Sequence, residues 1–305
     1  MANSRDIKRR IKSVANTSKI TRTMELIATA KSQQCVTRIK EALPYFHALA
    51  EIAREARKAG GSDEGEHALL EQREVKRVAI LTVVANRGLC GGYNGNVMRM
   101  ARDRRLALQA EGKEVKIVAS GKKGVNWLKF NKIPFEAKTY NQFEDRPAFS
   151  DVELVASHLI GLFLDREVDR VEIAYTHFAS AGRQYPVLET LLPITSENRK
   201  EEELEKAGEV AQQPFEGKGQ PNFEILPDPK SILDAIFPLQ AKLHLYRVYL
   251  EAATSEQIAR RIAMKNATDN AQEVGKALRM AYNRARQNQI TKEILEVLGG
   301  AEALA

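Results

Sequence analysis

The segment best suited to chemistry is the glycine-rich stretch Asn86–Asn94, which reads NRGLCGGYN. It follows an apolar run and precedes a predicted helix, which is where a phosphate-binding loop would lie. Its spacing matches neither GxGxxG nor GxxxxGK[ST], and the GKKG of Gly121–Gly124 is a weaker candidate of the same kind. We therefore favour a tight strand-to-helix turn in which Gly88, Gly91 and Gly92 are structural. A nucleotide-binding α/β enzyme with helical arms stays an alternative.

Nucleophilic and metal chemistry have little support. Cys90 lies near the start of a predicted helix and could be a nucleophile, but no histidine is close in sequence. The five histidines have no metal-ligand spacing, and neither HExxH nor CxxC occurs. We predict no catalytic residue, no cofactor and no metal, and hence a chain that is not an enzyme by itself.

Around the glycine-rich turn, strands alternate with helices. This order predicts a βαβ sheet covered on both faces, which is a Rossmann-like three-layer α/β domain. The predicted strands are 75–85, 114–120, 135–140, 168–178 and 185–194, and the predicted helices are 93–110, 122–130 and 151–166.

The two ends of the chain have the helical period instead. Apolar residues recur every three or four positions from Ser4 to Lys58 and again from Lys230 to Leu298. Pro44 and Pro238 are the expected kinks or ends. Each apolar stripe is narrow, so we expect neither helix to enter a globular core and predict that the two pair as a long antiparallel coiled coil.

These patterns divide the chain into four parts. We predict an N-terminal shaft helix over 1–58, an α/β domain over 73–195, a mobile acidic insertion over 196–224 and a C-terminal shaft helix over 226–305.

Charge is concentrated at one end. Residues 1–60 hold 13 Lys/Arg against 5 Asp/Glu in a chain of net charge +7. A basic helix suits an acidic protein cavity or nucleic acid, although no aromatic residues interleave with the cluster as in nucleic-acid binders. A basic coiled-coil nucleic-acid-binding protein is the second alternative. Two distant cysteines indicate a reducing compartment, and we see neither a signal peptide nor a run of about 20 apolar residues.

Five segments resemble, in order, the gamma subunits of F-type ATP synthases. They are Asp6–Thr21 (DIKRRIKSVANTSKIT), Met24–Lys31 (MELIATAK), Arg87–Asn94 (RGLCGGYN), Ser255–Asn270 (SEQIARRIAMKNATDN) and Tyr282–Glu293 (YNRARQNQITKE). The resemblance implies a non-catalytic central rotary shaft. It would couple proton-driven rotation of the membrane c-ring to ATP synthesis on a ring of alpha and beta subunits, with no direct insertion into the bilayer.

The resemblance also implies contact residues. Arg286, Gln287, Thr291 and Met24 match positions that meet the beta subunit. The segment Phe223–Lys230 matches the foot that meets the epsilon subunit and the rotor ring. The implied location is peripheral, on the cytoplasmic side of the bacterial inner membrane.

The chain departs from the family pattern at four places. Asn86 stands where an Asp is usual, and Leu226 stands where an acidic residue is usual. Gly299–Glu302 (GGAE) replaces Ser-Gly-Ala-Ala. The acidic insertion is longer than usual and has no cysteine, so the thiol switch of chloroplast members is absent.

Overall fold

The computed structural model describes residues 4–60, 67–194 and 229–302. The chain divides into two compact units, one of Lys31–Ala259 and one of Met1–Ala30 with Arg260–Ala305. Both terminal helices, α1 (Ser4–Gly60) and α6 (Pro229–Glu302), contribute residues to both units. The domain boundaries drawn from the sequence stay a prediction.

The larger unit contains a four-stranded mixed sheet in the order β2-β1-β3-β4. The strands are β1 (Arg77–Val83), β2 (Glu114–Ser120), β3 (Arg170–Ser180) and β4 (Arg183–Leu192). β1 pairs in parallel with β2 and β3, and β4 returns antiparallel to β3. The predicted α/β class is confirmed, with an antiparallel edge strand added to the parallel βαβ part.

One predicted strand, 135–140, does not form. The segment reaches β2 at two amides, where Glu136 N–H donates to Ile117 O and Tyr140 N–H donates to Ala119 O. Only an isolated bridge between Ser120 and Tyr140 results. Between these two hydrogen bonds the segment advances four positions and β2 only two, so the two backbones are out of register and form no continuous ladder.

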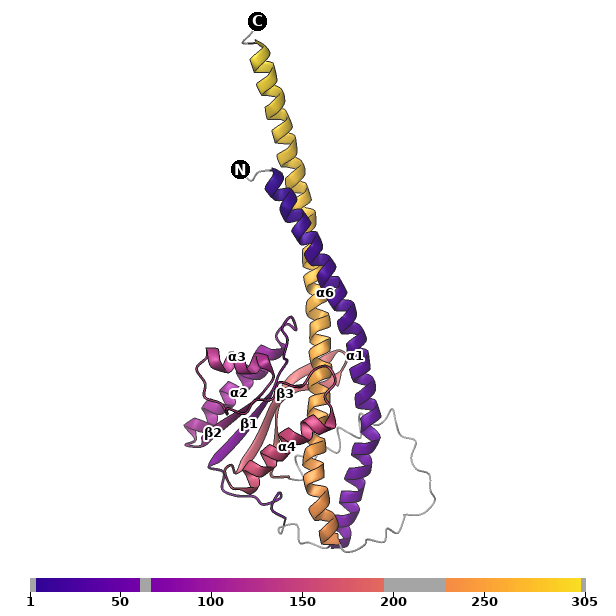
Figure 1. Ribbon diagram of the computed structural model, residues 1–305, viewed down its shortest axis with the longest axis vertical. Helices are drawn as coiled ribbons and strands as arrows, with labels where there is room; N and C mark the ends of the chain where they lie inside the picture. The colour runs from indigo at the N-terminus through magenta and orange to yellow at the C-terminus, as the bar shows by residue number, and fades with distance from the viewer. Residues whose placement is uncertain (1–3, 61–66, 195–228, 303–305) are drawn as a thin grey trace, which may run out of the picture. The chain divides into compact units, whose positions relative to one another are not determined.

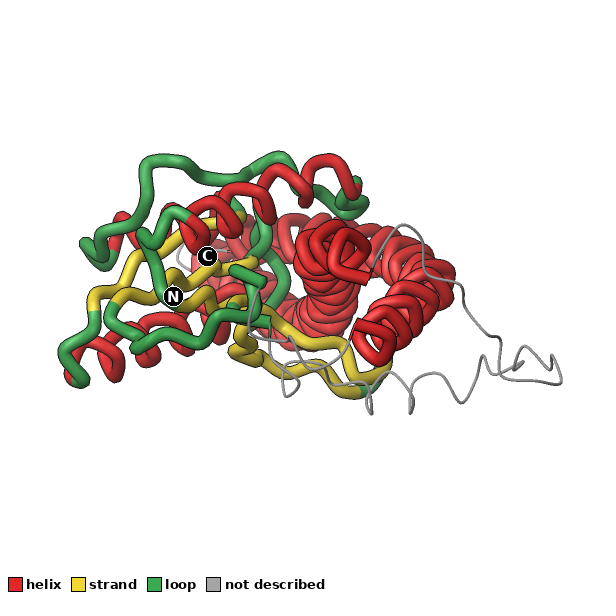
Figure 2. The backbone as a smooth tube through the Cα atoms, turned by 90° about the horizontal axis from the view of Figure 1, so that it is seen from below, coloured by secondary structure: helices red, strands yellow, loops and turns green. Residues whose placement is uncertain are grey.

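Helices cover both faces of the sheet (Figure 2). On one face lie α2 (Tyr93–Ala110) and α3 (Lys122–Phe130), which bury an apolar cluster with β1 and β2. On the other face lie α4 (Phe149–Leu164) and part of α6 (Figure 1). The three-layer prediction is therefore confirmed, and one of its layers includes a terminal helix.

The expectation that neither terminal helix enters a globular core is wrong for α6. Phe237, Ala241, Leu245, Val248 and Ala252 are buried against α4 and the sheet. Their spacings of four and three place them on one helical face, and the stripe is wide enough to cover a sheet. The helices also continue through Pro44 and Pro238, which end neither of them.

A buried ion pair lies between the sheet and α2. Glu172 of β3, directly opposite Ile80 of β1, is 2% exposed. Arg104 of α2 donates to both of its carboxylate oxygens, at 2.6 and 2.8 Å. This bond raises the pKa of Arg104 despite the opposing effect of its burial. The bidentate pair holds α2 to β3 with a fixed geometry.

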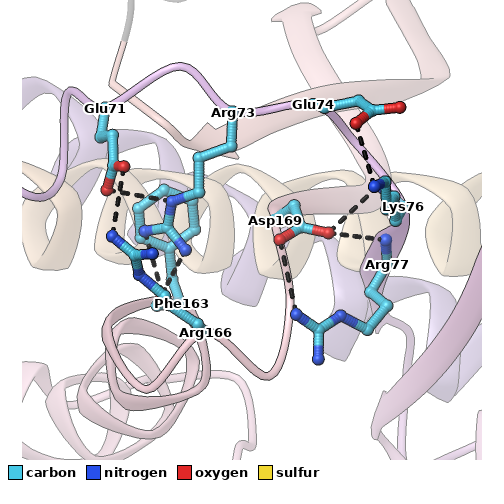
Figure 3. A network of polar contacts seen from close by, with 8 residues as sticks. All are labelled: Glu71, Arg73, Glu74, Lys76, Arg77, Phe163, Arg166 and Asp169. Atoms are coloured by element: carbon cyan, nitrogen blue, oxygen red, sulfur yellow. Dashed lines mark hydrogen bonds and ion pairs between the residues drawn. The ribbon is translucent and has the colours of Figure 1, made fainter.

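Polar contacts hold the segment that enters β1 (Figure 3). The Asp169 carboxylate accepts from the backbone N–H groups of Lys76 and Arg77, at 3.1 and 2.8 Å. The Arg73 guanidinium lies 4.3 Å from the centre of the Phe163 ring and donates to the Phe163 carbonyl. These contacts fix the amino ends of β1 and β3 side by side.

Candidate functional site

The glycine-rich turn lies at the carboxyl end of β1 and leads into α2. Leu89 and Gly91 have positive φ angles of 63° and 59°, a region that glycine adopts at the least cost. A Cβ built at Gly88 or Gly92 would first meet flexible side-chain atoms, of Lys123 and Asn96 respectively. Within the predicted structural turn, Gly91 is therefore the glycine that the backbone conformation itself favours.

The turn is closed by its own residues. Asn94 Oδ1 accepts from the Ala85 N–H at 2.9 Å, and Asn94 Nδ2 lies 3.2 Å from Cys90 Sγ. Cys90 is 2% exposed and packs with Ala85, Tyr93 and Ala259. A thiol enclosed in this way lacks the access that a nucleophile needs.

The crevice in which a nucleotide would bind is filled by the protein. In sheets of this kind ligands bind at the carboxyl ends of the strands, where the strand order reverses, which here is beside β1. Tyr249 of α6 donates to Ser120 Oγ at 2.8 Å, and its ring lies 4.1 Å from that of Phe143. Tyr93 donates to the carbonyl oxygen of Ala252 at 3.0 Å. Burial raises the pKa of Tyr249, so its hydroxyl stays a donor.

The side-chain amide of Asn86 makes three hydrogen bonds. Its Nδ2 donates to the carbonyl oxygens of Asn141 and Phe143, at 2.9 and 2.6 Å. Its Oδ1 accepts from the Lys122 N–H at 2.9 Å. A carboxylate in this place could accept but not donate, so it would face two carbonyl oxygens. The amide therefore suits this loop better than an Asp carboxylate would.

The loop that Asn86 holds also reaches both long helices. The Asp145 carboxylate accepts from Lys31 Nζ of α1 and, at 2.5 Å, from Gln257 Nε2 of α6. Arg146 donates to Gln34 Oε1 of α1 at 2.9 Å. Within this unit, one short loop thus connects the end of β1 to α1 and α6.

A cavity of about 500 Å³ lies beside this junction. Cys35, Arg38, Arg146 and Glu144 are among the residues that line it. Burial, and next the negative charge of Asp145, raise the pKa of the Cys35 thiol to about 11. The thiol is therefore protonated at neutral pH and is a weak nucleophile. The described residues also bring together no group of three or more His, Cys, Asp or Glu side chains that could hold a metal ion.

The smaller unit consists of the outer parts of α1 and α6, packed against each other. Ser4 Oγ donates to Gln289 Oε1 at 2.9 Å, and the hydroxyls of Thr21 and Thr268 lie 2.8 Å apart. Residue numbers rise along one helix as they fall along the other. The predicted antiparallel pairing of the two terminal helices is confirmed.

The residues predicted to contact partners lie mainly in the smaller unit. Met24 of α1 is half-buried, while Arg286, Gln287 and Thr291 of α6 are exposed. Phe223 and Leu226, and the whole predicted insertion 196–224, lie outside the described residues. Lys230 is in the first turn of α6. The structure thus brings no partner-contact residues together into a pocket among those it describes.

Sequence reasoning missed the importance of Gly121. Its φ is +100°, and a Cβ built there would lie 2.0 Å from the Val84 carbonyl oxygen. The GKKG spacing suggested a weak phosphate loop, whereas the backbone passes too close to β1 for any side chain. The role of Asp145 was also missed, because its partners Lys31 and Gln257 are more than 100 residues away in sequence.

Comparison with known proteins identifies the family. The family model described as ATP synthase matches residues 3–304. An ATP synthase gamma chain of Rhodopirellula baltica is 43% identical over 307 residues, covering 100% of this chain and 99% of its own length. The gamma chain of Leptospira biflexa is 39% identical and that of a Cyanothece strain 41%, each with complete coverage of both chains.

Solved structures agree on the fold. A chain of the Euglena gracilis mitochondrial ATP synthase, from the structure of OSCP, F1 and the c-ring, has a TM-score of 0.67, with 22% identity. It covers 99% of this chain, and 94% of its own length is matched. A chain of the Tetrahymena thermophila enzyme, from its central stalk and c-ring, has a TM-score of 0.54 with 20% identity, covering 81% of this chain and 99% of its own.

Among the described residues, no helix has the length and apolarity to cross a bilayer. This chain belongs to the family of ATP synthase gamma chains, the non-catalytic central stalk of the F-type rotor.

Proposed function

We propose that the chain works as a rotary shaft that couples proton-driven rotation of a membrane ring to ATP synthesis on a ring of alpha and beta subunits. The observation that carries the proposal is the course of α6. It contributes core residues such as Leu245 and Val248 to the α/β unit and then pairs with α1 in the other unit. One helix that belongs to both units can transmit a twist from one to the other.

We further propose which partners each part meets. The solved structures of similar chains come from assemblies with F1 and with a c-ring. By analogy, the helix pair would enter the ring of alpha and beta subunits, and the α/β unit would meet epsilon and the c-ring. The chain would then be a peripheral protein on the cytoplasmic side of the bacterial inner membrane.

The outer helix pair has the surface that such a partner would need. The basic side chains of Lys8, Arg10, Lys12 and Lys19 are exposed on α1. Exposed Arg286, Gln287 and Thr291 extend from α6, and we propose that they and Met24 meet beta. An asymmetric shaft presents a different face to each surrounding subunit, and such differential contacts can shift the state of each catalytic site.

For the foot, we propose Phe223, Leu226 and Lys230 as contacts with epsilon and the rotor ring. This assignment rests on the match of the segment 223–230 to the family pattern. Leu226 offers an apolar contact where an acidic side chain is usual.

The two alternatives have weaker support. A nucleotide enzyme would need the crevice that Tyr249 and Phe143 fill. A nucleic-acid binder would also use the basic face of α1, but that reading leaves the α/β unit without a role.

The test uses the chain assembled with its alpha, beta and epsilon subunits. Replacing Arg286, Gln287 and Thr291 together by Ala should lower the rate of ATP hydrolysis roughly tenfold, the effect of losing a charge-assisted hydrogen bond. Lys292→Ala is the matched control, because exposed Lys292 lies roughly 100–140° around α6 from each of the three residues. Equal effects of the two changes, or ATP hydrolysis by the purified chain alone, would refute the proposal.

A further inference from the structure

The short loop Asn141–Arg146 contacts three parts of the larger unit, namely the end of β1, α1 and α6. Its backbone carbonyls at Asn141 and Phe143 accept from Asn86, which follows β1. The Phe143 ring packs on Tyr249 of α6. Asp145 then accepts from one residue of each long helix. The sheet, α1 and α6 therefore meet at this one loop.

The contacts at this loop differ from those that bury α6 in reaching both long helices. The buried face of α6 from Phe237 to Ala252 combines apolar side chains, whose burial is non-directional, with polar contacts to the sheet such as Tyr249 to Ser120 and His244 to Glu189. Hydrogen bonds and ion pairs weaken steeply when their angles change. At Asp145 such bonds come from Lys31 and Gln257, so they resist rotation of either helix against the loop.

Asn86 anchors the loop on the sheet side. Because its Oδ1 accepts from the Lys122 N–H, the amide cannot turn over without losing that bond. Its two N–H groups are thereby aimed at the Asn141 and Phe143 carbonyls. The Asp145 carboxylate follows two residues after Phe143, so the amide positions the group that receives both helices.

We propose that Asn86 and Asp145 form a torsional joint, in which the loop Asn141–Arg146 couples the sheet to both long helices. Asn86 is the positioning residue, because it holds the loop in place. Asp145 transmits torque to α1 through Lys31 and to α6 through Gln257. The proposal rests on the proposed function as a rotary shaft. It adds the place at which torque passes between the α/β unit and the helices.

The test measures torsional stiffness and coupling in the complete complex with its membrane sector. Asn86→Asp removes both donors and sets a carboxylate against two carbonyl oxygens. It should lower the stiffness of the stalk roughly twofold, since two of the joint's hydrogen bonds are lost. Proton pumping per ATP hydrolysed should fall with it. Asn131→Asp is the matched control, because Asn131 Nδ2 also donates to a carbonyl oxygen, that of Trp127, but within one helix end.

A second variant covers the case in which Asn86→Asp fails to assemble. Lys31→Met removes a partly exposed ion pair, and such pairs contribute little to stability. It should therefore assemble normally and still lower the stiffness and the pumping ratio. Lys113→Met, which removes an ion pair with the nearby Glu111, is its control and should change neither.

The outcomes separate the two proposals. If the unmodified complex does not rotate, the shaft function itself fails. If it rotates and Lys31→Met leaves both stiffness and pumping ratio at the unmodified values, only the joint is overturned. A loss of thermal stability with an unchanged pumping ratio also overturns it, because that is the result expected of a purely structural contact.

Discussion

The hydroxyl oxygens of Thr21 and Thr268 lie 2.8 Å apart between α1 and α6. Thr268 is 3% exposed and Thr21 is 9% exposed, so this contact is a polar point within the packed face of the helix pair. Each hydroxyl also lies near a carbonyl oxygen of its own helix, Ser18 for Thr21 and Met264 for Thr268. The contact therefore fixes the axial register of α1 relative to α6.

The first prediction concerns this pair. Thr268→Val should lower the free energy of unfolding by about 1 kcal/mol, because it leaves the Thr21 hydroxyl without its partner across the interface. Replacing both residues by Val should cost less than the sum of the two single changes, since two apolar groups of the same shape then face each other. Urea unfolding of the four proteins gives this comparison, and simple additivity would contradict the contact.

The second prediction concerns the start of β1. Asp169→Ala leaves the N–H groups of Lys76 and Arg77 without their acceptor and should cost about 2–3 kcal/mol. Asp103→Ala removes an exposed carboxylate paired with its neighbour Arg102, and should change stability by less than about 0.5 kcal/mol. Chemical unfolding measures both. Similar losses in the two variants would argue against the strand contact.

The third prediction contrasts two glycines. Gly121→Ala forces a Cβ to within 2.0 Å of the Val84 carbonyl oxygen at a positive φ, so the protein should lose several kcal/mol, on the order of 3 or more, or fail to fold. Gly95, within α2, has open space around the position of a Cβ. Gly95→Ala should stabilise by roughly 0.5–1 kcal/mol through helix propensity. Thermal unfolding of both variants tests the contrast.

The fourth prediction concerns acid stability. Burial of Glu189 raises the pKa of its carboxyl, but His244 and Arg247 lower it more, to about 2 from an ordinary 4.5. The His244 Nε2 lies 3.3 Å and the Arg247 guanidinium 3.7 Å from this carboxylate. Since the folded pKa is the lower one, the unfolded state takes up the proton first as pH falls. The stabilisation is present above about pH 4.5 and is lost towards pH 2.

Glu189→Gln tests this acid dependence. The variant should be less stable than the parent at neutral pH, and its unfolding free energy should fall less steeply between pH 4.5 and 2. Unfolding curves across that range give both slopes. Parallel slopes would show that Glu189 does not contribute to the acid dependence.

Several features followed from the sequence alone. The helices 93–110 and 122–130 and the strand 114–120 have the predicted bounds. Their periodicity and the glycines and turns between them are local signals, so no distant contact was needed to define them. The long terminal helices and their antiparallel pairing also followed, because residues of the chain's two ends carry matching apolar stripes. The motifs then indicated the family.

Other features depended on tertiary contacts. The strand predicted at 135–140 failed because its pairing with β2 is interrupted, which local β propensity does not reveal. The burial of α6 against the sheet also could not be read from its stripe, since a stripe shows that a face is apolar but not what covers it. The glycine requirement at Gly121 arises from the approach of Val84, 37 positions earlier.

The proposed joint also combines features that the sequence shows with contacts that only the tertiary structure shows. The sequence by itself determined that Asn86 follows the first predicted strand, and that the chain has a basic helix at one end and a glycine-rich turn after that strand. Only the tertiary structure decided that the Asn86 amide holds the loop that carries Asp145, and that Lys31 and Gln257 meet there. The physical reason is that side-chain hydrogen bonds depend on distances between distant segments, whereas periodicity and turn chemistry depend on near neighbours in the chain.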